Sequence, residues 1–119
     1  MEIHESAEDY LEMILILKQR LGKVRSIDIV NEMNYSKPSV SIAMKKLREN
    51  GYITTDGNGY IEFSNSGFEC ANRIYDRHKT ITNFLIQIGV SSEIASQDAC
   101  RIEHDINEET FKKIKDQVK

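Results

Sequence analysis

Three side chains that can bind a transition metal lie close together in the segment QDACRIEHD, residues 97–105. They are the thiol, carboxylate and imidazole of Cys100, Glu103 and His104. If the segment is helical, positions i, i+3 and i+4 lie on one face, so these three groups converge. The apolar residues Ala99, Ile102 and Ile106 cluster on a different face. The spacing therefore predicts a helix that docks by one side and presents metal ligands on the other.

Three further ligand candidates lie elsewhere in the chain. They are Asp9, Glu12 and His78. Asp9 and Glu12 share one face of a predicted helix, away from its apolar stripe. If that face meets the cysteine-bearing helix, with His78 alongside, six potential ligands surround one space. Carboxylates and imidazole suit Mn(II) and Fe(II), and a thiolate adds preference for Fe(II), Co(II), Ni(II) or Zn(II). Taken singly, the two acids also fit an acidic helix N-terminus, and His78 fits a hydrogen-bonded core residue.

The elements before these positions follow a helix-turn-helix pattern. A first helix opens with a possible N-cap at Ser6, repeats apolar residues at helical spacing and stops at Gly22. Its apolar stripe is Ala7, Tyr10, Ile14, Leu17 and Leu21. Ser26 can cap a short second helix, and Pro38 fits the first turn of a third helix that ends at Gly51. The runs GYITT and GYIEFS, joined around DGNG, predict a hairpin whose Gly and Asn residues accept positive φ. Three helices followed by a hairpin predict a winged helix-turn-helix.

Basic residues are concentrated in this part of the chain. The net charge is −3, yet residues 18–48 carry eight Lys and Arg against two acids, whereas residues 1–17 carry five acids and neither Lys nor Arg. The third helix packs inward through Val40, Ala43, Met44 and Leu47, which leaves small hydroxyl and basic side chains outside. The predicted DNA-contacting residues are Arg25, Ser36, Lys37, Pro38, Ser39, Ser41, Ile42, Lys45, Lys46 and Arg48. Small residues early in such a helix suit base edges, and the Lys and Arg suit phosphates. A solvated charged face, or a winged fold used for protein interaction, remains the alternative.

A second, helical lobe is predicted after the hairpin. A long helix is expected to start near Gly67 and to end at Gly89, followed by helices in SSEIASQDACRIEHDI and, capped by Asn107, in NEETFKKIKDQVK. The inward stripe of the long helix is Ala71, Ile74, His78, Ile81, Leu85 and Ile88. The predicted fold is mainly α with a small β-hairpin wing. We expect a winged helix-turn-helix DNA-binding domain at residues 1–66 and a helical metal-binding and dimerisation domain at residues 67–119.

Composition excludes several classes of protein. The chain has 119 residues, 39% apolar and 29% charged, which is ordinary for a soluble globular protein. Its longest apolar run, MILIL, is far short of a bilayer span, and no leader pattern is present, so a cytoplasmic location is expected. We expect Cys70 and Cys100 to be reduced there. A metalloenzyme is disfavoured because HExxH and nucleophile-elbow patterns are absent.

Four motifs carry a resemblance to a known family. In order, AEDYLEMILIL, KPSVSIAMKKLRENGYI, YDRHKTITNFLIQIGV and DACRIEHDI resemble the landmarks of the iron- and manganese-dependent metalloregulators, typified by the diphtheria toxin repressor and the manganese transport repressor. The resemblance implies a winged helix-turn-helix and a helical lobe that dimerises and shares the metal sites. It also implies a ligand set, which is Asp9, Glu12, His78, Cys100, Glu103 and His104.

The resemblance implies a function as well, although the ligand set is a hybrid. Asp9 and Glu12 match the manganese-type branch of the family, whereas Cys100 matches the iron-type branch. The expected function is a cytoplasmic, homodimeric repressor that is activated by Fe(II) or Mn(II), binds a palindromic operator and controls metal-homeostasis genes. A metal-independent winged-helix regulator or a protein-interaction module is the alternative.

Overall fold

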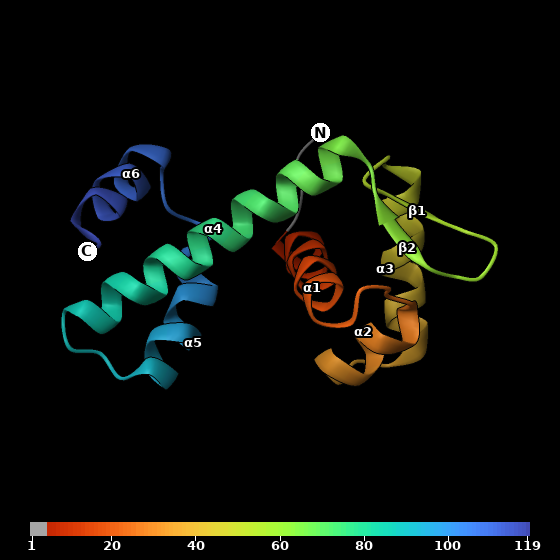
Figure 1. Ribbon diagram of the computed structural model, residues 1–119, viewed down its shortest axis with the longest axis horizontal. Coiled ribbons are helices and arrows are strands. Elements are labelled where there is room, and N and C mark those ends of the chain that lie inside the picture. The colour runs from red at the N-terminus through yellow and green to blue at the C-terminus, as the bar shows by residue number, and fades with distance from the viewer. Residues whose placement is uncertain (1–4) are drawn as a thin grey trace. The chain divides into compact units, whose positions relative to one another are not determined.

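The computed structural model describes residues 5–119, which form six helices and one two-stranded antiparallel sheet (Figure 1). The elements are α1 (Glu5–Leu21), α2 (Ser26–Met33), α3 (Lys37–Glu49), β1 (Ile53–Thr55), β2 (Ile61–Phe63), α4 (Asn65–Gln87), α5 (Ser92–Ile102) and α6 (Glu108–Gln117). This confirms the predicted mainly helical fold with a hairpin wing. None of these described helices has both the length and the apolar character needed to cross a membrane.

The chain divides into two compact units, one ending at Asn72 and the other beginning at Arg73. We call them the N-terminal and C-terminal units. The division falls within α4, so the last turns of the N-terminal unit and the first turns of the C-terminal unit belong to one helix. The predicted domain boundary after residue 66 stays a prediction.

The core of the N-terminal unit forms where α1, α2 and α3 pack against one another. Its buried apolar side chains include Leu11, Ile14, Leu17, Val24, Ile29, Val40, Met44, Leu47, Ile53 and Ile61. The predicted stripe of α1 is wrong at Leu21, whose side chain is 51% exposed in the last residue of the helix. Gly22 follows with a φ of +83°, which confirms the predicted stop. Ser6 lies inside α1 rather than capping it.

Side chains at the ends of α2 and α3 fix the turn between these helices. Arg25, not Ser26, occupies the N-cap of α2, and its backbone N–H donates to the Asp28 carboxylate at 2.9 Å. The Ser26 cap prediction is therefore wrong. Asn34 ends α2 in the left-handed conformation, with a φ of 58°. The Ser36 hydroxyl then caps α3 by accepting the Ser39 N–H at 3.2 Å.

The wing is a short hairpin in which Ile53 pairs with Phe63 and Thr55 with Ile61. Its loop is organised by Asp56, whose carboxylate accepts the N–H groups of Asn58 at 2.8 Å and Tyr60 at 2.9 Å. In the loop, which the structure describes in full, Gly59 alone has a positive φ, so the expected conformation is confirmed for Gly59 and wrong for Gly57 and Asn58. The Asp56 carboxylate and the positive φ of Gly59 therefore determine the shape of the hairpin loop.

The C-terminal unit packs α4, α5 and α6 around a small apolar cluster. Its buried members are Ile81, Ala99 and Phe111, with Leu85, Ile102 and Ile106 packed against them. The predicted stripe of α4 is wrong at its end, because Ile88 follows the helix and is 60% exposed. Asn107 caps α6 as predicted, since its side chain accepts the Glu109 N–H at 2.8 Å.

Candidate metal centre and nucleic-acid interface

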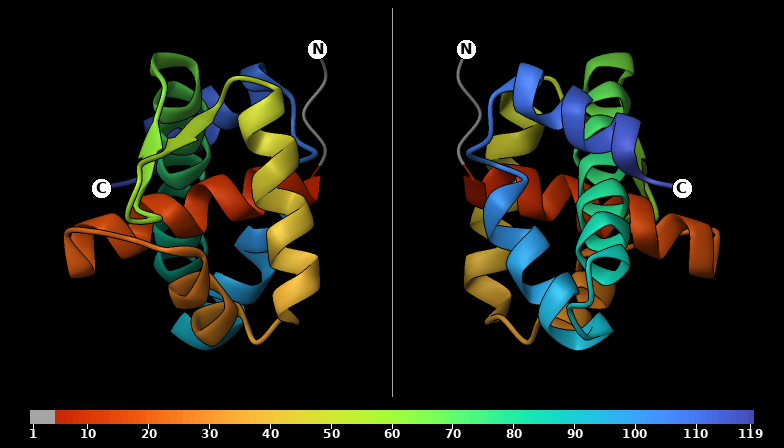
Figure 2. Two further views of the ribbon diagram at one scale, coloured as in Figure 1. Left: turned by 90° about the vertical axis from the view of Figure 1, so that its right-hand side faces the viewer. Right: turned by 90° about the vertical axis from the view of Figure 1, so that its left-hand side faces the viewer.

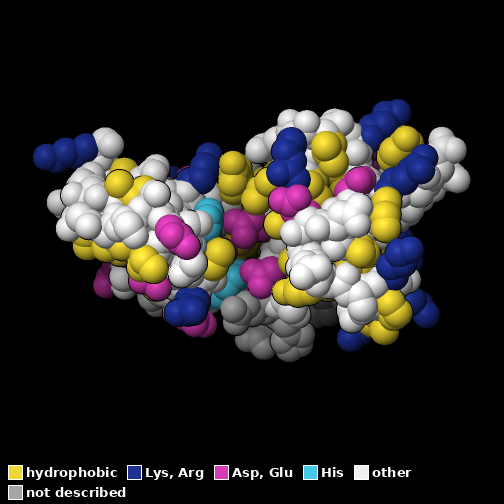
Figure 3. All heavy atoms as spheres, turned by 90° about the horizontal axis from the view of Figure 1, so that it is seen from below, with side chains coloured by type: hydrophobic (Ala, Val, Ile, Leu, Met, Phe, Trp, Pro, Cys, Tyr) yellow, Lys and Arg dark blue, Asp and Glu magenta, His cyan; other side chains and the backbone are white. Residues whose placement is uncertain are grey.

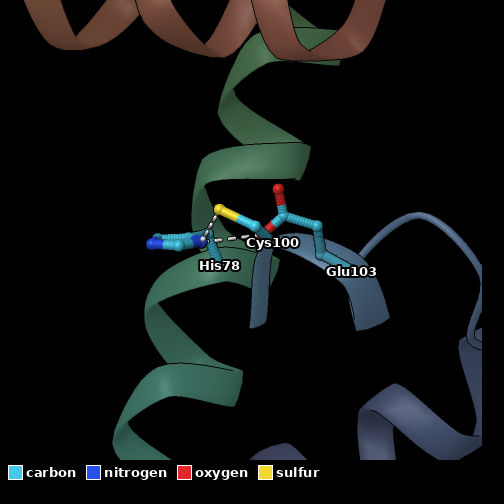
Figure 4. Close-up of side chains that lie close together, drawn as sticks. All are labelled: His78, Cys100 and Glu103. Carbon is cyan, nitrogen blue, oxygen red and sulfur yellow. Dashed lines mark hydrogen bonds and ion pairs between the residues drawn. The ribbon is translucent and has the colours of Figure 1, made fainter. Parts of the chain in front are cut away.

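Three of the predicted ligands converge within the C-terminal unit (Figure 4). His78 projects from α4, Cys100 from the last turns of α5, and Glu103 from the residue that follows α5. One potential ligand atom from each side chain lies within 4.8 Å of the other two. His78 Nδ1 is 2.8 Å from Glu103 Oε2 and 3.8 Å from Cys100 Sγ. The imidazole thus joins the thiol and the carboxylate in one cluster, and we call these three side chains the His78 cluster.

The end of α5 determines which ligands share a face. The predicted helix continues through His104, but in the structure α5 ends at Ile102. Glu103 keeps right-handed helical angles, and its N–H donates to Ala99 O at 2.9 Å, so it lies one turn above Cys100. His104 lies beyond the helix, with Nε2 3.5 Å from Glu103 Oε1. The prediction of one continuous helical face is therefore correct for Cys100 and Glu103 and wrong for His104.

The position of His78 also differs from the prediction. The stripe of α4 places this residue among inward apolar side chains, whereas its side chain is 19% exposed and bonded to Glu103. Cys100 is exposed, Cys70 is buried, and neither belongs to a disulfide. That both cysteines are reduced stays a prediction. An exposed thiol beside an imidazole is accessible to an incoming ion.

The donor set of the His78 cluster fits a divalent transition metal. Bonds from such an ion to sulfur, nitrogen and oxygen are about 2.0–2.3 Å, so two ligands of one ion lie roughly 3–4 Å apart. The 3.8 Å between Cys100 Sγ and His78 Nδ1 is of this size, and the 2.8 Å between His78 Nδ1 and Glu103 Oε2 is slightly shorter. Glu103 is fully buried, and its Oε1, which lies 3.5 Å from His104 Nε2, accepts no hydrogen bond from the described residues. Such a buried carboxylate oxygen is costly unless a donor or a cation satisfies it.

Asp9 and Glu12 belong to α1 of the N-terminal unit, where their spacing places them on one side of the helix. Their part in a common centre with the His78 cluster stays a prediction.

The outer face of α3 confirms the predicted division of that helix. Val40, Met44 and Leu47 are buried and Ala43 is half-buried. The exposed side chains are Ser39, Ser41, Ile42, Lys45, Lys46 and Arg48. The left view of Figure 2 shows α3 beside the hairpin in the N-terminal unit. On the face drawn in Figure 3, Lys and Arg side chains gather at the right-hand end, which is the N-terminal unit. The unit therefore presents a helix with small, polar and basic side chains to solvent.

Two contacts connect the predicted DNA-contacting residues to the wing. The Arg25 guanidinium lies over the Tyr60 ring, 4.4 Å from its centroid, and the Lys23 ammonium lies 5.0 Å from the same centroid. Arg48 Nη1 donates to Thr55 Oγ1 at 3.3 Å. Tyr60 was not among the predicted residues, because Lys23 and Arg25 are distant from it in the sequence and meet its ring only in the folded unit. The remaining predicted residues, Lys37 and Pro38, are exposed in the first turn of α3.

Comparison with known proteins covers both units. Residues 2–61 match the N-terminal DNA-binding domain of the iron-dependent repressors, and residues 64–119 match the metal-binding and dimerisation domain of the same family. An uncharacterised HTH-type transcriptional regulator of Methanocaldococcus jannaschii, MJ0568, is 33% identical over 93% of this chain and 90% of its own length. The transcriptional regulator MntR of Escherichia coli O6:H1 is 34% identical over 90% of this chain and 69% of its own.

Solved structures show the same relationship. The crystal structure of T. acidophilum IdeR has a TM-score of 0.80 and 27% identity, covering 98% of this chain and 55% of that one. The metal-dependent transcriptional regulator MtsR has a TM-score of 0.85 and 26% identity, covering 92% of this chain and 52% of that one. The chain thus spans about half the length of these solved structures. With both family domains matched in order, the chain belongs to the iron-dependent repressors, a family of metal-responsive, DNA-binding transcriptional repressors.

Proposed function

We propose that this chain is a homodimeric, cytoplasmic repressor that is activated by Fe(II) or Mn(II) and acts at palindromic operators of metal-homeostasis genes. The observation that carries the proposal is the convergence of His78, Cys100 and Glu103 in a chain whose α3 presents hydroxyl and basic side chains. The full proposed ligand set is Asp9, Glu12, His78, Cys100, Glu103 and His104. A divalent ion would supply positive charge that several acids and a thiolate share.

The residues of the His78 cluster prepare this site before an ion arrives. The hydrogen bond between His78 Nδ1 and Glu103 Oε2 holds these two side chains together, so that an imidazole from α4 faces a carboxylate at the end of α5. Binding requires the thiol to lose its proton and the imidazole nitrogen that becomes a ligand to be unprotonated. Because Asp9 and Glu12 belong to the N-terminal unit, a common ion would favour one orientation of the DNA-binding unit.

The consequence for DNA binding follows from symmetry. The two recognition helices of a dimer must reach half-sites about 34 Å apart, or a multiple of that distance. Metal that favours this arrangement raises DNA affinity, and DNA must then raise metal affinity by the same factor.

The exposed face of α3 divides into two roles in this proposal. Ser39, Ser41 and Ile42 lie in the first turns, where side chains reach base edges or the thymine methyl. Lys45, Lys46 and Arg48 follow and contact phosphates. The flanking residues that complete the surface are Arg25, Ser36, Lys37 and Pro38. The Ser36 hydroxyl already accepts the Ser39 N–H, so Ser36 acts chiefly by fixing the start of the helix.

A metal-dependent DNA-binding assay tests this function. DNA selected from a random pool is titrated with the full chain in the presence of Mn(II), Fe(II) under anaerobic conditions, Co(II) or a chelator, and binding is followed by fluorescence anisotropy. We expect tight binding with metal and weak binding with chelator. Glu103→Gln should abolish the metal response, whereas Glu109→Gln, an exposed change in α6, should retain it. Equal DNA affinity with metal and with chelator would favour a metal-independent winged-helix regulator.

A further inference from the structure

Arg77, the residue before His78 on α4, is a buried cation with an unusual set of partners. Its side chain is 8% exposed, and its guanidinium lies over the Phe111 ring, 5.2 Å from the centroid. Nη1 donates to the main-chain carbonyl of Glu103 at 3.1 Å and to that of Ile106 at 3.2 Å. Nη2 donates to Glu108 Oε2 at 2.6 Å. One guanidinium therefore binds three points between the end of α5 and the first turn of α6.

Arg77 adds side-chain bonds to a turn whose own main chain makes two hydrogen bonds, from the N–H groups of Asp105 and Ile106 to Ile102 O. Residues 103–107 contain no Gly or Pro, and the turn lies between the last residue of α5 and the Asn107 cap of α6. The Glu103 carbonyl lies at the C-terminus of α5, where intrahelical donors are missing, and the Ile106 carbonyl lies just before the Asn107 cap. Arg77 supplies donors to both carbonyls. One of them belongs to Glu103, the residue whose side chain closes the His78 cluster.

This arrangement couples the two sides of the cluster. His78 and Arg77 are neighbours on α4, so the helix that carries the imidazole also carries the group that fixes the main chain of Glu103. The three bonds set the distance between α4 and the 103–108 turn, and thereby the position of Glu103 relative to His78. A lysine cannot reproduce this, because an ammonium lacks the planar fork that binds partners in fixed directions.

We propose that Arg77 is a positioning residue of the metal centre, holding the Glu103 main chain so that its carboxylate meets His78 and Cys100. The inference rests on the proposed metal-binding function. The competing explanation is that Arg77 only stabilises the packing of α6. The two differ in one respect: a positioning role changes metal affinity and ligand geometry in a protein that remains folded.

Co(II) binding by the full chain separates these roles. Coordination of a thiolate by Co(II) gives an intense near-ultraviolet charge-transfer band, and the visible bands report the geometry of the ligands. We expect Arg77→Lys to weaken Co(II) binding by about 10–100-fold, as is typical when a group supporting a metal ligand is changed. The visible spectrum should change as well. Arg77→Met should weaken Co(II) binding further, because Met has no positive charge and no hydrogen-bond donor. The lysine variant, which keeps both, should therefore retain part of the affinity.

The matched control is Lys115→Met, which removes the 3.0 Å ion pair between Lys115 and Asp76. That pair also connects α6 to α4, but it makes no bond to the 103–108 turn. We expect this variant to keep the wild-type Co(II) affinity and spectrum. Circular dichroism and urea denaturation of the metal-free proteins establish which variants are folded.

Each outcome has a distinct meaning. Folded Arg77→Lys with wild-type affinity and spectrum would overturn the positioning role while leaving the proposed metal function intact. If Arg77→Lys does not fold, Glu108→Gln decides: a smaller loss of Co(II) affinity with a changed spectrum supports the role, and wild-type behaviour overturns it. If the wild-type chain itself binds no Co(II), the proposed function fails and the positioning role fails with it.

Discussion

Replacing Gly67 by Ala tests how closely the main chain at the start of the wing approaches α4. Gly67 lies in the first turn of α4, and a Cβ added there comes within 1.9 Å of the carbonyl oxygen of Tyr52, just before β1. The obstructing atoms are backbone, so no side chain can turn aside. The same carbonyl accepts the Ser64 N–H at 3.0 Å and the Ser64 hydroxyl at 3.1 Å. Relieving the clash therefore requires movement of the strand or of the helix.

The expected cost follows from these contacts. Movement of about 1 Å weakens both hydrogen bonds to the Tyr52 carbonyl, each worth about 1 kcal/mol. Forcing an extra carbon into a packed site costs a further ~1–3 kcal/mol. The higher helix propensity of Ala offsets about 1 kcal/mol of this. We expect Gly67→Ala to lower the free energy of unfolding by roughly 2–4 kcal/mol, which for a unit of this size lowers Tm by at least about 8 °C.

Thermal unfolding of the full chain, followed by circular dichroism, measures this effect. Gly57→Ala is the matched control, because a Cβ at Gly57 meets no atom within 4 Å and its φ lies outside the left-handed region. The control should change the free energy of unfolding by no more than about 0.5 kcal/mol. Equal melting temperatures for the two variants would refute the close approach of α4 to the wing.

Other predictions concern DNA and metal. Replacing Lys45 and Lys46 by Ala should weaken binding to every DNA sequence and reduce the slope of log K against log salt by about 1 for each phosphate that is no longer neutralised. Anisotropy titrations over a salt series measure this slope. An unchanged slope would mean that another surface contacts the phosphates. Replacing Cys100 by Glu should raise the affinity for Mn(II) relative to Co(II), because a carboxylate is a harder ligand than a thiolate. Calorimetric titration with each ion measures the two affinities. An unchanged ratio of these affinities would exclude thiolate ligation. Metal affinity of the wild-type chain should fall as the pH drops, since Cys100 must bind as a thiolate and His78 through a deprotonated nitrogen. Co(II) titrations at several pH values measure this affinity. An affinity that does not change with pH would contradict the prediction.

Apolar spacing and turn chemistry predicted the order of the elements in the N-terminal unit, although not the caps of α1 and α2. Val40, Met44 and Leu47 recur at helical spacing and are buried, and Gly22 and Pro38 mark a helix end and a helix start. These signals act over a few residues, so they are visible without the rest of the chain. The same rules failed at Leu21 and Ile88, because a periodic pattern does not show where a helix stops facing its core.

The closeness of Cys100 and Glu103 was predictable from the sequence, whereas the contacts around them were not. Cys100 and Glu103 are separated by one helical turn, which spacing reveals, and His78 was a candidate from its residue type and its place on the predicted long helix. Arg77 was missed because two of its partners are main-chain carbonyls, which carry no side-chain signature. The early end of α5 was missed for a related reason: neither Gly nor Pro follows Ile102 to mark it.

The continuity of α4 has a consequence for dissecting the protein. Proteases cut most readily in exposed loops, and the two units are joined between Asn72 and Arg73 within a helix rather than by a loop. Limited proteolysis should therefore attack the hairpin loop at residues 57–59 or the α4–α5 connection before it separates the units. A truncated N-terminal fragment that stops at Asn72 would have its new terminus in mid-helix, where the last four carbonyls lose their donors. Fragments that retain α4 through Gly89 avoid this fraying and are the better starting point for isolating the DNA-binding half.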